Sequence, residues 1–156
     1  QYIQAELKAE GKRCNCIRCR EVKEGVYDLV PELLNLKIDT KGGTEHLLTF
    51  EKDNKLFSLL RLRLPTSGTL LFPELKGAAI IREIHTYGKT LSHTDKISSK
   101  TQHRGLGKLL MAEAEKIAAT AGYKKIAVIS SIGTREYYRK LEYDREGSYM
   151  VKYLKG

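Results

Sequence analysis

The sequence predicts a single α+β or mixed-sheet domain. Alternating apolar strands fill residues 29–64, and the second half of the chain runs strand, helix, strand, helix, strand. The chain has 156 residues, enough for one domain of ordinary size and too few for two well-packed ones. Hydrophobic residues make up 41% and charged residues 30%, which are proportions typical of a folded, soluble protein.

The elements of the first half follow from periodicity and from turn residues. Apolar residues four apart near the N-terminus predict a short helix that Gly11 ends, and Asp53-Asn54 is typical of a hairpin turn. The expected order is a helix over 2–10, a basic cysteine-bearing segment to 20, strands at 34–38, 45–51 and 55–64, and a loop over 65–73.

The second half contains the clearest helix, because apolar residues recur at helical spacing from Leu106 and stop at Gly122. A short, wholly apolar run after it is typical of a buried strand. The expected order is a strand over 78–87, a polar loop over 89–101, a helix over 106–121, a strand at 126–129, a short helix over 134–141 and a closing strand at 149–154.

The chain is strongly basic, with 28 Lys and Arg against 19 Asp and Glu and a formal net charge of +9. Residues 95–125 alone carry seven basic against three acidic residues. This balance favours polyanionic partners such as nucleic acid or a phosphate-bearing cofactor, and the plainer alternative is a surface whose charge only keeps the protein in solution.

Targeting signals are lacking in the sequence. No apolar run approaches the ~20 residues that span a bilayer, and the N-terminus has no signal-peptide core. We therefore expect no membrane partner, no secreted disulfide scaffold and a cytoplasmic location. The chain begins at Gln1 and its methionines are Met111 and Met150, so we expect a piece of a longer protein.

The most informative segment is Gln102-His103-Arg104-Gly105-Leu106-Gly107, which opens the long helix. The first turn of a helix leaves about four backbone N–H groups without intrahelical partners and carries partial positive charge. Glycines there let a phosphate approach the backbone, and Arg104 and Lys108 add charge. The segment predicts a docked diphosphate, although two glycines opening an isolated helix are more often turn chemistry.

Three other stretches of the sequence make the interpretation of this segment more specific. Gln-x-x-Gly-x-Gly opening a helix after a strand resembles the acetyl-coenzyme A loop of the GCN5-related N-acetyltransferase fold. Together with Arg82 to Gly88, Ile126 to Leu141 and Cys14 to Val22, it resembles the acetyltransferase domain of the catalytic subunit of Elongator, a tRNA-modifying complex. The resemblance covers most of the chain. It implies a mixed, mostly antiparallel sheet flanked by helices, with acetyl-coenzyme A (acetyl-CoA) in a V-shaped opening between two central strands.

The resemblance also implies a division of the chain and a set of partners. Residues 1–25 would form a linker and zinc-binding segment, and residues 26–156 the acetyltransferase domain. Full-length family members carry a preceding radical S-adenosylmethionine domain with a 4Fe-4S cluster, act on the wobble uridine (U34) of tRNA and can have accessory subunits. The cysteines here do not match the Cys-x₃-Cys-x₂-Cys spacing of that radical domain, so we expect it to be missing from this chain.

Cys14, Cys16 and Cys19 place three thiols within six residues. Zinc usually takes four tetrahedral ligands, and three can come from one loop. By resemblance these are the zinc ligands of the family. The alternative is three free or partly disulfide-linked thiols, and the sequence shows no fourth ligand.

Tyr137 and Tyr138 lie on the expected short helix, where a phenol can protonate a departing thiolate. Two aromatic residues on an amphipathic helix are more often both packing residues. The resemblance reverses that preference, because the tyrosine pair occupies the acetyl-CoA position of the family, and it favours Tyr138 as both catalytic and cofactor-binding.

The strand that carries Glu83, Ile84, His85 and Thr86 should run beside the pantetheine arm of the cofactor, as strands of this fold do. Alternation predicts that Glu83 and His85 share a face. Glu83 is a candidate general base, whereas His85 is as well explained as an ordinary sheet residue.

Three alternatives remain at this stage. One is a conventional acetyltransferase acting on lysine or a small amine, with the same cofactor loop. Another is a zinc-stabilised tRNA-binding module without turnover. In the third, this chain binds acetyl-CoA poorly because the radical domain helps to close the pocket.

Overall fold

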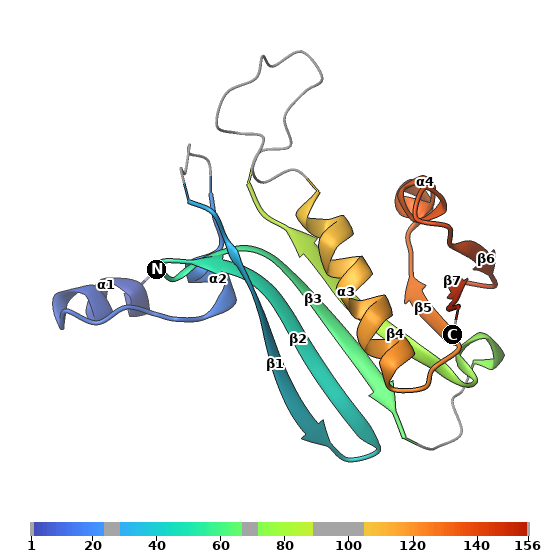
Figure 1. The fold of residues 1–156 in the computed structure, drawn as a ribbon. Helices are drawn as coiled ribbons and strands as arrows, with labels where there is room; N and C mark the ends of the chain where they lie inside the picture. The colour runs from blue at the N-terminus through green and yellow to red at the C-terminus, as the bar shows by residue number, and fades with distance from the viewer. Residues whose placement is uncertain (1, 24–28, 67–71, 89–104, 156) are drawn as a thin grey trace, which may run out of the picture.

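A seven-stranded mixed sheet organises the protein, with strand order β1-β2-β3-β4-β5-β7-β6 (Figure 1). The computed structural model describes residues 2–23, 29–66, 72–88 and 105–155. Neighbouring strands are antiparallel except for β4 and β5, which are parallel, so the predicted α+β class is confirmed. The strands are β1 (Glu32–Thr40), β2 (Gly43–Lys52), β3 (Lys55–Pro65), β4 (Ala78–Thr86), β5 (Lys125–Ile129), β6 (Asp144–Glu146) and β7 (Tyr149–Tyr153).

The helices agree with the expected order, and the structure adds short elements that the sequence did not reveal. The helices are α1 (Tyr2–Ala9), α2 (Ile17–Arg20), α3 (Leu106–Thr120) and α4 (Arg135–Arg139), with single 3-10 turns η1 (Pro73–Leu75) and η3 (Ile132–Thr134). Periodicity missed α2, both 3-10 turns and β6 because each is four residues or fewer. The loop predicted over residues 89–101 lies outside the described residues.

The main core lies between α3 and one face of β2, β3 and β4 (Figure 1). Leu110, Ala114 and Ala118 recur along α3 at helical spacing and are fully buried. They meet alternate residues of the strands, such as Leu60 and Ile81, which are also fully buried. The apolar periodicity of the sequence therefore places α3 on this face of the sheet, which we call the α3 face.

A β-bulge in β4 determines which of its later residues point toward α3. Arg61 is opposite Glu83 and Leu62 is opposite Ile81, so Arg82 is an extra residue without a partner on β3. Before the bulge, Ile81 faces α3. After it, Ile84 packs on the same core.

The parallel pairing of β4 with β5 is short. It ends at the pair Ile81 and Val128, whereas β4 continues along β3 as far as the pair Ser58 and Thr86. Past Ile81, the side of β4 that faced β5 therefore has no strand partner among the described residues.

The cysteine-bearing segment is attached to the hairpin of β2 and β3. Arg20 donates two hydrogen bonds to the Glu51 carboxylate at 2.7 and 2.8 Å, and both side chains are mostly buried. The backbone N–H of Val22 donates to the carbonyl of Leu56 at 2.9 Å, and Val22 joins the main core. This segment therefore has a fixed position against the sheet.

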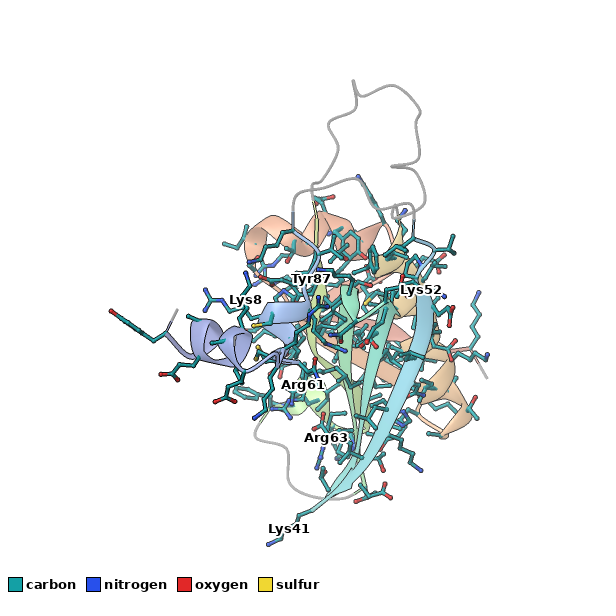
Figure 2. All side chains as sticks on the ribbon, turned by 90° about the vertical axis from the view of Figure 1, so that its left-hand side faces the viewer. Lys8, Lys41, Lys52, Arg61, Arg63 and Tyr87 are labelled. Carbon is teal, nitrogen blue, oxygen red and sulfur yellow. The ribbon has the colours of Figure 1, made fainter. Side chains whose placement is uncertain are left out.

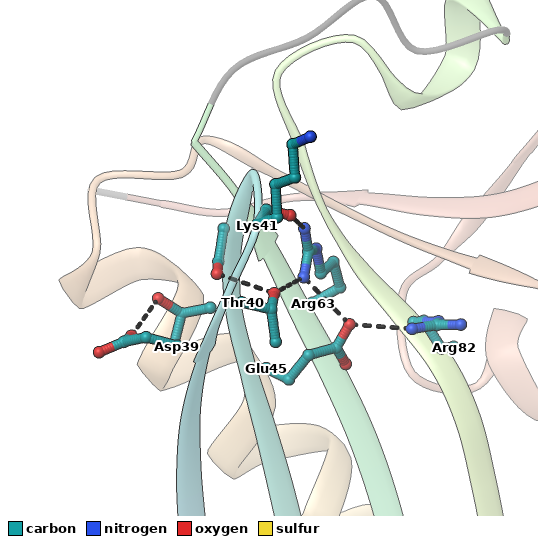
Figure 3. Close-up of polar contacts among 8 residues, drawn as sticks. Asp39, Thr40, Lys41, Glu45, Arg63 and Arg82 are labelled. Carbon is teal, nitrogen blue, oxygen red and sulfur yellow. Dashed lines mark hydrogen bonds and ion pairs between the residues drawn. The ribbon is translucent and has the colours of Figure 1, made fainter.

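The face of β1 to β4 opposite α3 carries arginines and carboxylates. Arg61 and Arg63 follow one another along β3, and Lys41 lies at the tip of the β1–β2 hairpin (Figure 2). Glu45 accepts from Arg63 at 3.4 Å and from Arg82 at 2.9 Å, which ties three strands together (Figure 3).

None of the helices in the described part of the chain is long and apolar enough to cross a bilayer.

Replacing Leu60 by alanine is expected to lower the free energy of unfolding by about 2–5 kcal/mol, because the change leaves a cavity in the α3-face core. Leu36→Ala is the matched control, since Leu36 is 56% exposed on β1. It should change that free energy by no more than about 0.5 kcal/mol. Urea unfolding measures both, and equal losses would contradict this placement of the core.

Candidate functional site

The N-terminus of α3 lies beside the part of β4 that has no partner on its β5 side. Gly105 precedes the helix with φ of +86°, in the left-handed region that favours glycine, and its carbonyl accepts the first helical bond from Leu109. The N–H groups of Leu106, Gly107 and Lys108 therefore have no intrahelical acceptor. These are the groups that the sequence predicted to hold a diphosphate.

The residues of the predicted glycine segment fall into three groups. Leu106 is buried in the core, so it can offer a ligand only its backbone, whereas Lys108 is exposed. Gly107 is partly buried within the first turn. Gln102, His103 and Arg104 lie outside the described residues.

Gly107 marks the closest approach of α3 to β4 and α4. A Cβ at this position would lie 3.1 Å from Tyr137 Oη, 3.3 Å from Thr86 Oγ1 and 4.0 Å from Ile84 Cδ1. Glycine therefore leaves a small space between two hydroxyls at the start of the helix, which we call the Gly107 cradle. The structure thus brings Gly107, Ile84, Thr86 and Tyr137 together, all of them predicted site residues.

The two tyrosines of α4 have different surroundings. Tyr138 is 5% exposed and packs in the main core, where its ring centroid lies 6.1 Å from that of Tyr143. Tyr137 is partly buried and directs its hydroxyl to the Gly107 cradle. Burial raises the pKa of both phenols, with a smaller contribution from Tyr138 to Tyr137, so each stays protonated at neutral pH.

The position of α4 is fixed by contacts with α3 and β7. The Tyr143 hydroxyl donates to Glu115 on α3 at 2.9 Å, and Lys152 on β7 donates to the same carboxylate at 2.9 Å. Because Tyr143 follows α4 and packs on Tyr138, this network holds α4 beside the helix that carries Gly107.

Glu83 and His85 share a face of β4, as alternation predicted. His85 Nε2 lies 3.0 Å from Glu83 Oε1, and Arg61 Nη1 lies 3.5 Å from Glu83 Oε2. Beyond the bulge, Glu83 and His85 point to one face of β4 and Ile84 points to the other. The side chains of Glu83 and His85 therefore lie away from the Gly107 cradle. The role of Glu83 as a general base stays a prediction.

Sequence reasoning missed one residue that has a buried polar atom. Ser130 follows β5, and its Oγ is shielded from solvent without a hydrogen-bond partner among the described residues. A single serine after an apolar run is a weak signal, and only the strand register shows which face it occupies.

The three cysteines form a compact cluster at α2, which contains Cys19 and begins directly after Cys16. Their Sγ atoms all lie within 4.8 Å of one another, and no other His, Cys, Asp or Glu in the described ranges joins them. Hydrogen bonds from Cys14 and from the backbone of Cys19 lower the pKa of the Cys16 thiol, which favours the thiolate form that metals bind. A tetrahedral metal ion with metal–sulfur bonds of ~2.3 Å needs sulfurs about 3.8 Å apart, so a cluster of this size can supply three ligands to a metal ion.

Comparison with known proteins gives consistent matches along nearly the whole chain. The chain is 39% identical over 156 residues to a tRNA uridine(34) acetyltransferase of Dehalococcoides mccartyi, and the match covers 95% of this chain and 34% of the relative. It is 42% identical over 159 residues to Elongator complex protein 3 of Homo sapiens, covering 97% of this chain and 29% of the relative. The chain thus spans about a third of the length of these relatives. No protein-family model matches the sequence.

Two solved structures also match this chain. An archaeal Methanocaldococcus infernus Elp3 with an N-terminal deletion matches with a TM-score of 0.78 and 39% identity, covering 98% of this chain and 38% of that chain. A GNAT-family acetyltransferase of Desulfovibrio desulfuricans matches with a TM-score of 0.52 at 14% identity, covering 71% of this chain and 70% of that chain, which supports the fold alone. The fold is that of the GCN5-related N-acetyltransferases, and the homologues of this chain are the Elongator complex protein 3 and tRNA uridine(34) acetyltransferase proteins.

Proposed function

We propose that this chain is the acetyl-CoA-binding acetyltransferase part of an enzyme that modifies the wobble uridine of tRNA. The observation that carries the proposal is the Gly107 cradle, where the first turn of α3, the end of β4 without a strand on its β5 side and the Tyr137 hydroxyl meet. The supporting comparison is about 40% identity to tRNA uridine(34) acetyltransferases along almost the entire chain.

The residues present fit acetyl-CoA in three places. The free N–H groups at the start of α3 suit the diphosphate, and Lys108 adds a positive charge nearby. The backbone of residues 83–86 offers hydrogen bonds to an extended arm in the place of a neighbouring strand. At position 107, glycine adds no side chain where α3, Thr86 and Tyr137 converge, so no further group stands in the way of that arm there. Gln102, His103 and Arg104 complete the proposed diphosphate site.

Acetyl-CoA supplies an activated acetyl thioester when bound. We assign to Tyr137 the proton that the departing thiolate needs, because its hydroxyl points to the cradle and its raised pKa keeps the phenol protonated. The position of Tyr138 in the core favours a supporting role, in which its ring holds Tyr137 in place at a centroid distance of 5.2 Å.

Transfer to tRNA belongs to the longer enzyme. The chain matches only about a third of each relative, so the radical S-adenosylmethionine domain with its 4Fe-4S cluster, any accessory subunits and the tRNA itself remain proposed partners. A net charge of +9 suits a tRNA backbone and the cofactor phosphates alike.

We also propose that Cys14, Cys16 and Cys19 hold a structural zinc ion within the segment 1–25, with residues 26–156 as the acetyltransferase domain. The ion would stabilise the loop that leads into α2 and Arg20.

Gly107→Asp should abolish acetyl-CoA binding, because it places a carboxylate in the cradle and beside the diphosphate groups. Isothermal titration calorimetry with acetyl-CoA measures this. Ala112→Asp is the matched control, since it adds the same charge at an exposed position of the same helix and should bind as the wild type does. Normal binding by folded Gly107→Asp would overturn the assignment of the site.

Tyr137→Phe should slow acetyl-CoA cleavage by about 100-fold or more, since the general acid is lost, while leaving the affinity nearly unchanged. Release of free coenzyme A in the presence of tRNA measures the rate. Tyr138→Phe is the comparison and should retain most of the activity. The reverse pattern, with Tyr138→Phe slow and Tyr137→Phe active, would assign the proton to Tyr138 instead.

Purified protein should contain about one zinc ion per chain by elemental mass spectrometry, because three clustered thiolates are available. Cys16→Ser should lose most of this metal, whereas Asn15→Ala, between two of the ligands, should keep it. Zinc retained by the serine variant would exclude this cluster as the metal site.

A further inference from the structure

Ser130, directly after β5, carries one of the buried polar atoms that no described residue satisfies. Its Oγ is shielded from solvent and has no hydrogen-bond partner in the described part of the chain. Such a buried group is disfavoured unless something else satisfies it. The neighbouring Ser131 differs, because its Oγ lies 3.3 Å from Thr134 Oγ1, with which it can share a hydrogen bond. A contact within the turn therefore satisfies the hydroxyl of Ser131, whereas the hydroxyl of Ser130 has no such contact.

Strand register places Ser130 beside the proposed path of the cofactor arm. Ile126 and Val128 belong to the main core on the α3 face, and alternation puts Ser130 on that face too. Val128 and Ile81 form the last pair between β5 and β4. Past this pair, Ser130 directly after β5 and Ile84 on β4 are the next residues on the α3 face.

Ile84 connects this position to the Gly107 cradle, because its Cδ1 lies 4.0 Å from the Cβ position of Gly107. An extended ligand between the two strands would find backbone groups on the β4 side. β5 also pairs with β7, along its edge away from β4, as far as the pair Ile129 and Tyr149. On the other side of the opening, the Ser130 hydroxyl directly after β5 is a side-chain hydrogen-bonding group on the α3 face.

We propose that Ser130 is a positioning residue for the donor, whose hydroxyl forms a hydrogen bond with an amide group of the pantetheine arm of acetyl-CoA. A serine hydroxyl can donate to the amide carbonyl or accept from its N–H, so either orientation of the amide satisfies it. The bond fixes how far the arm slides along β4 and hence where the thioester lies relative to Tyr137. This inference rests on the proposed function, since it assumes that acetyl-CoA binds at the Gly107 cradle.

The test compares Ser130→Ala with Ser131→Ala in isothermal titration calorimetry, using acetyl-CoA and adenosine 3′-phosphate 5′-diphosphate, which lacks the arm. Ser130→Ala should weaken acetyl-CoA binding about three- to tenfold and leave the armless nucleotide unaffected. Ser131→Ala should bind both ligands as the wild type does.

Thermal unfolding separates a ligand contact from a structural role. Without ligand, Ser130→Ala should unfold at the same temperature as the wild type or higher, because it removes an unsatisfied buried hydroxyl. Equal acetyl-CoA affinity for Ser130→Ala and wild type, or a parallel loss for the armless nucleotide, would overturn the inference while leaving the proposed function standing. Wild-type protein that fails to bind acetyl-CoA would instead overturn the proposed function.

Discussion

The β-bulge at Arg82 determines the direction of every β4 side chain that follows it, and the site depends on that direction. With the extra residue, Ile84 lies on the α3 face beside Gly107, and Glu83 and His85 lie on the other face beside Arg61. A regular strand would exchange the two sets, because side chains alternate with a period of two. Arg82 donates to Glu45 on β2, which also accepts from Arg63 on β3, so one carboxylate links the bulge to both of these strands.

The elements that define the architecture could be predicted from the sequence because they carry strong local signals. The apolar periodicity of α3, the short apolar run of β5 and the glycines at 105 and 107 all identify their elements correctly. The cysteine spacing likewise identifies a cluster that the fold keeps compact. These features depend on residues close together in the chain, so a pattern in one segment is sufficient evidence.

Features that depend on register or on distant contacts could not be predicted in this way. Nothing local marks Arg82 as the extra residue of β4, because the bulge exists only relative to β3. The choice between Tyr137 and Tyr138 also depends on distant contacts. The two residues are adjacent on α4, and only the packing of Tyr138 against Tyr143 decides which hydroxyl reaches Gly107. Ser130 becomes notable only when the end of the β4–β5 pairing is known.

The exposure of β1 has a consequence for how the protein behaves at high concentration. All nine residues of this strand are exposed, it forms one edge of the sheet, and Leu34, Leu36 and Ile38 line one of its faces. An edge of this kind is a template for pairing with further strands, and in folded proteins charges on the strand oppose such growth. In β1 this restraint comes from Glu32, Lys37 and Asp39, so salt that screens these charges favours self-association of the protein.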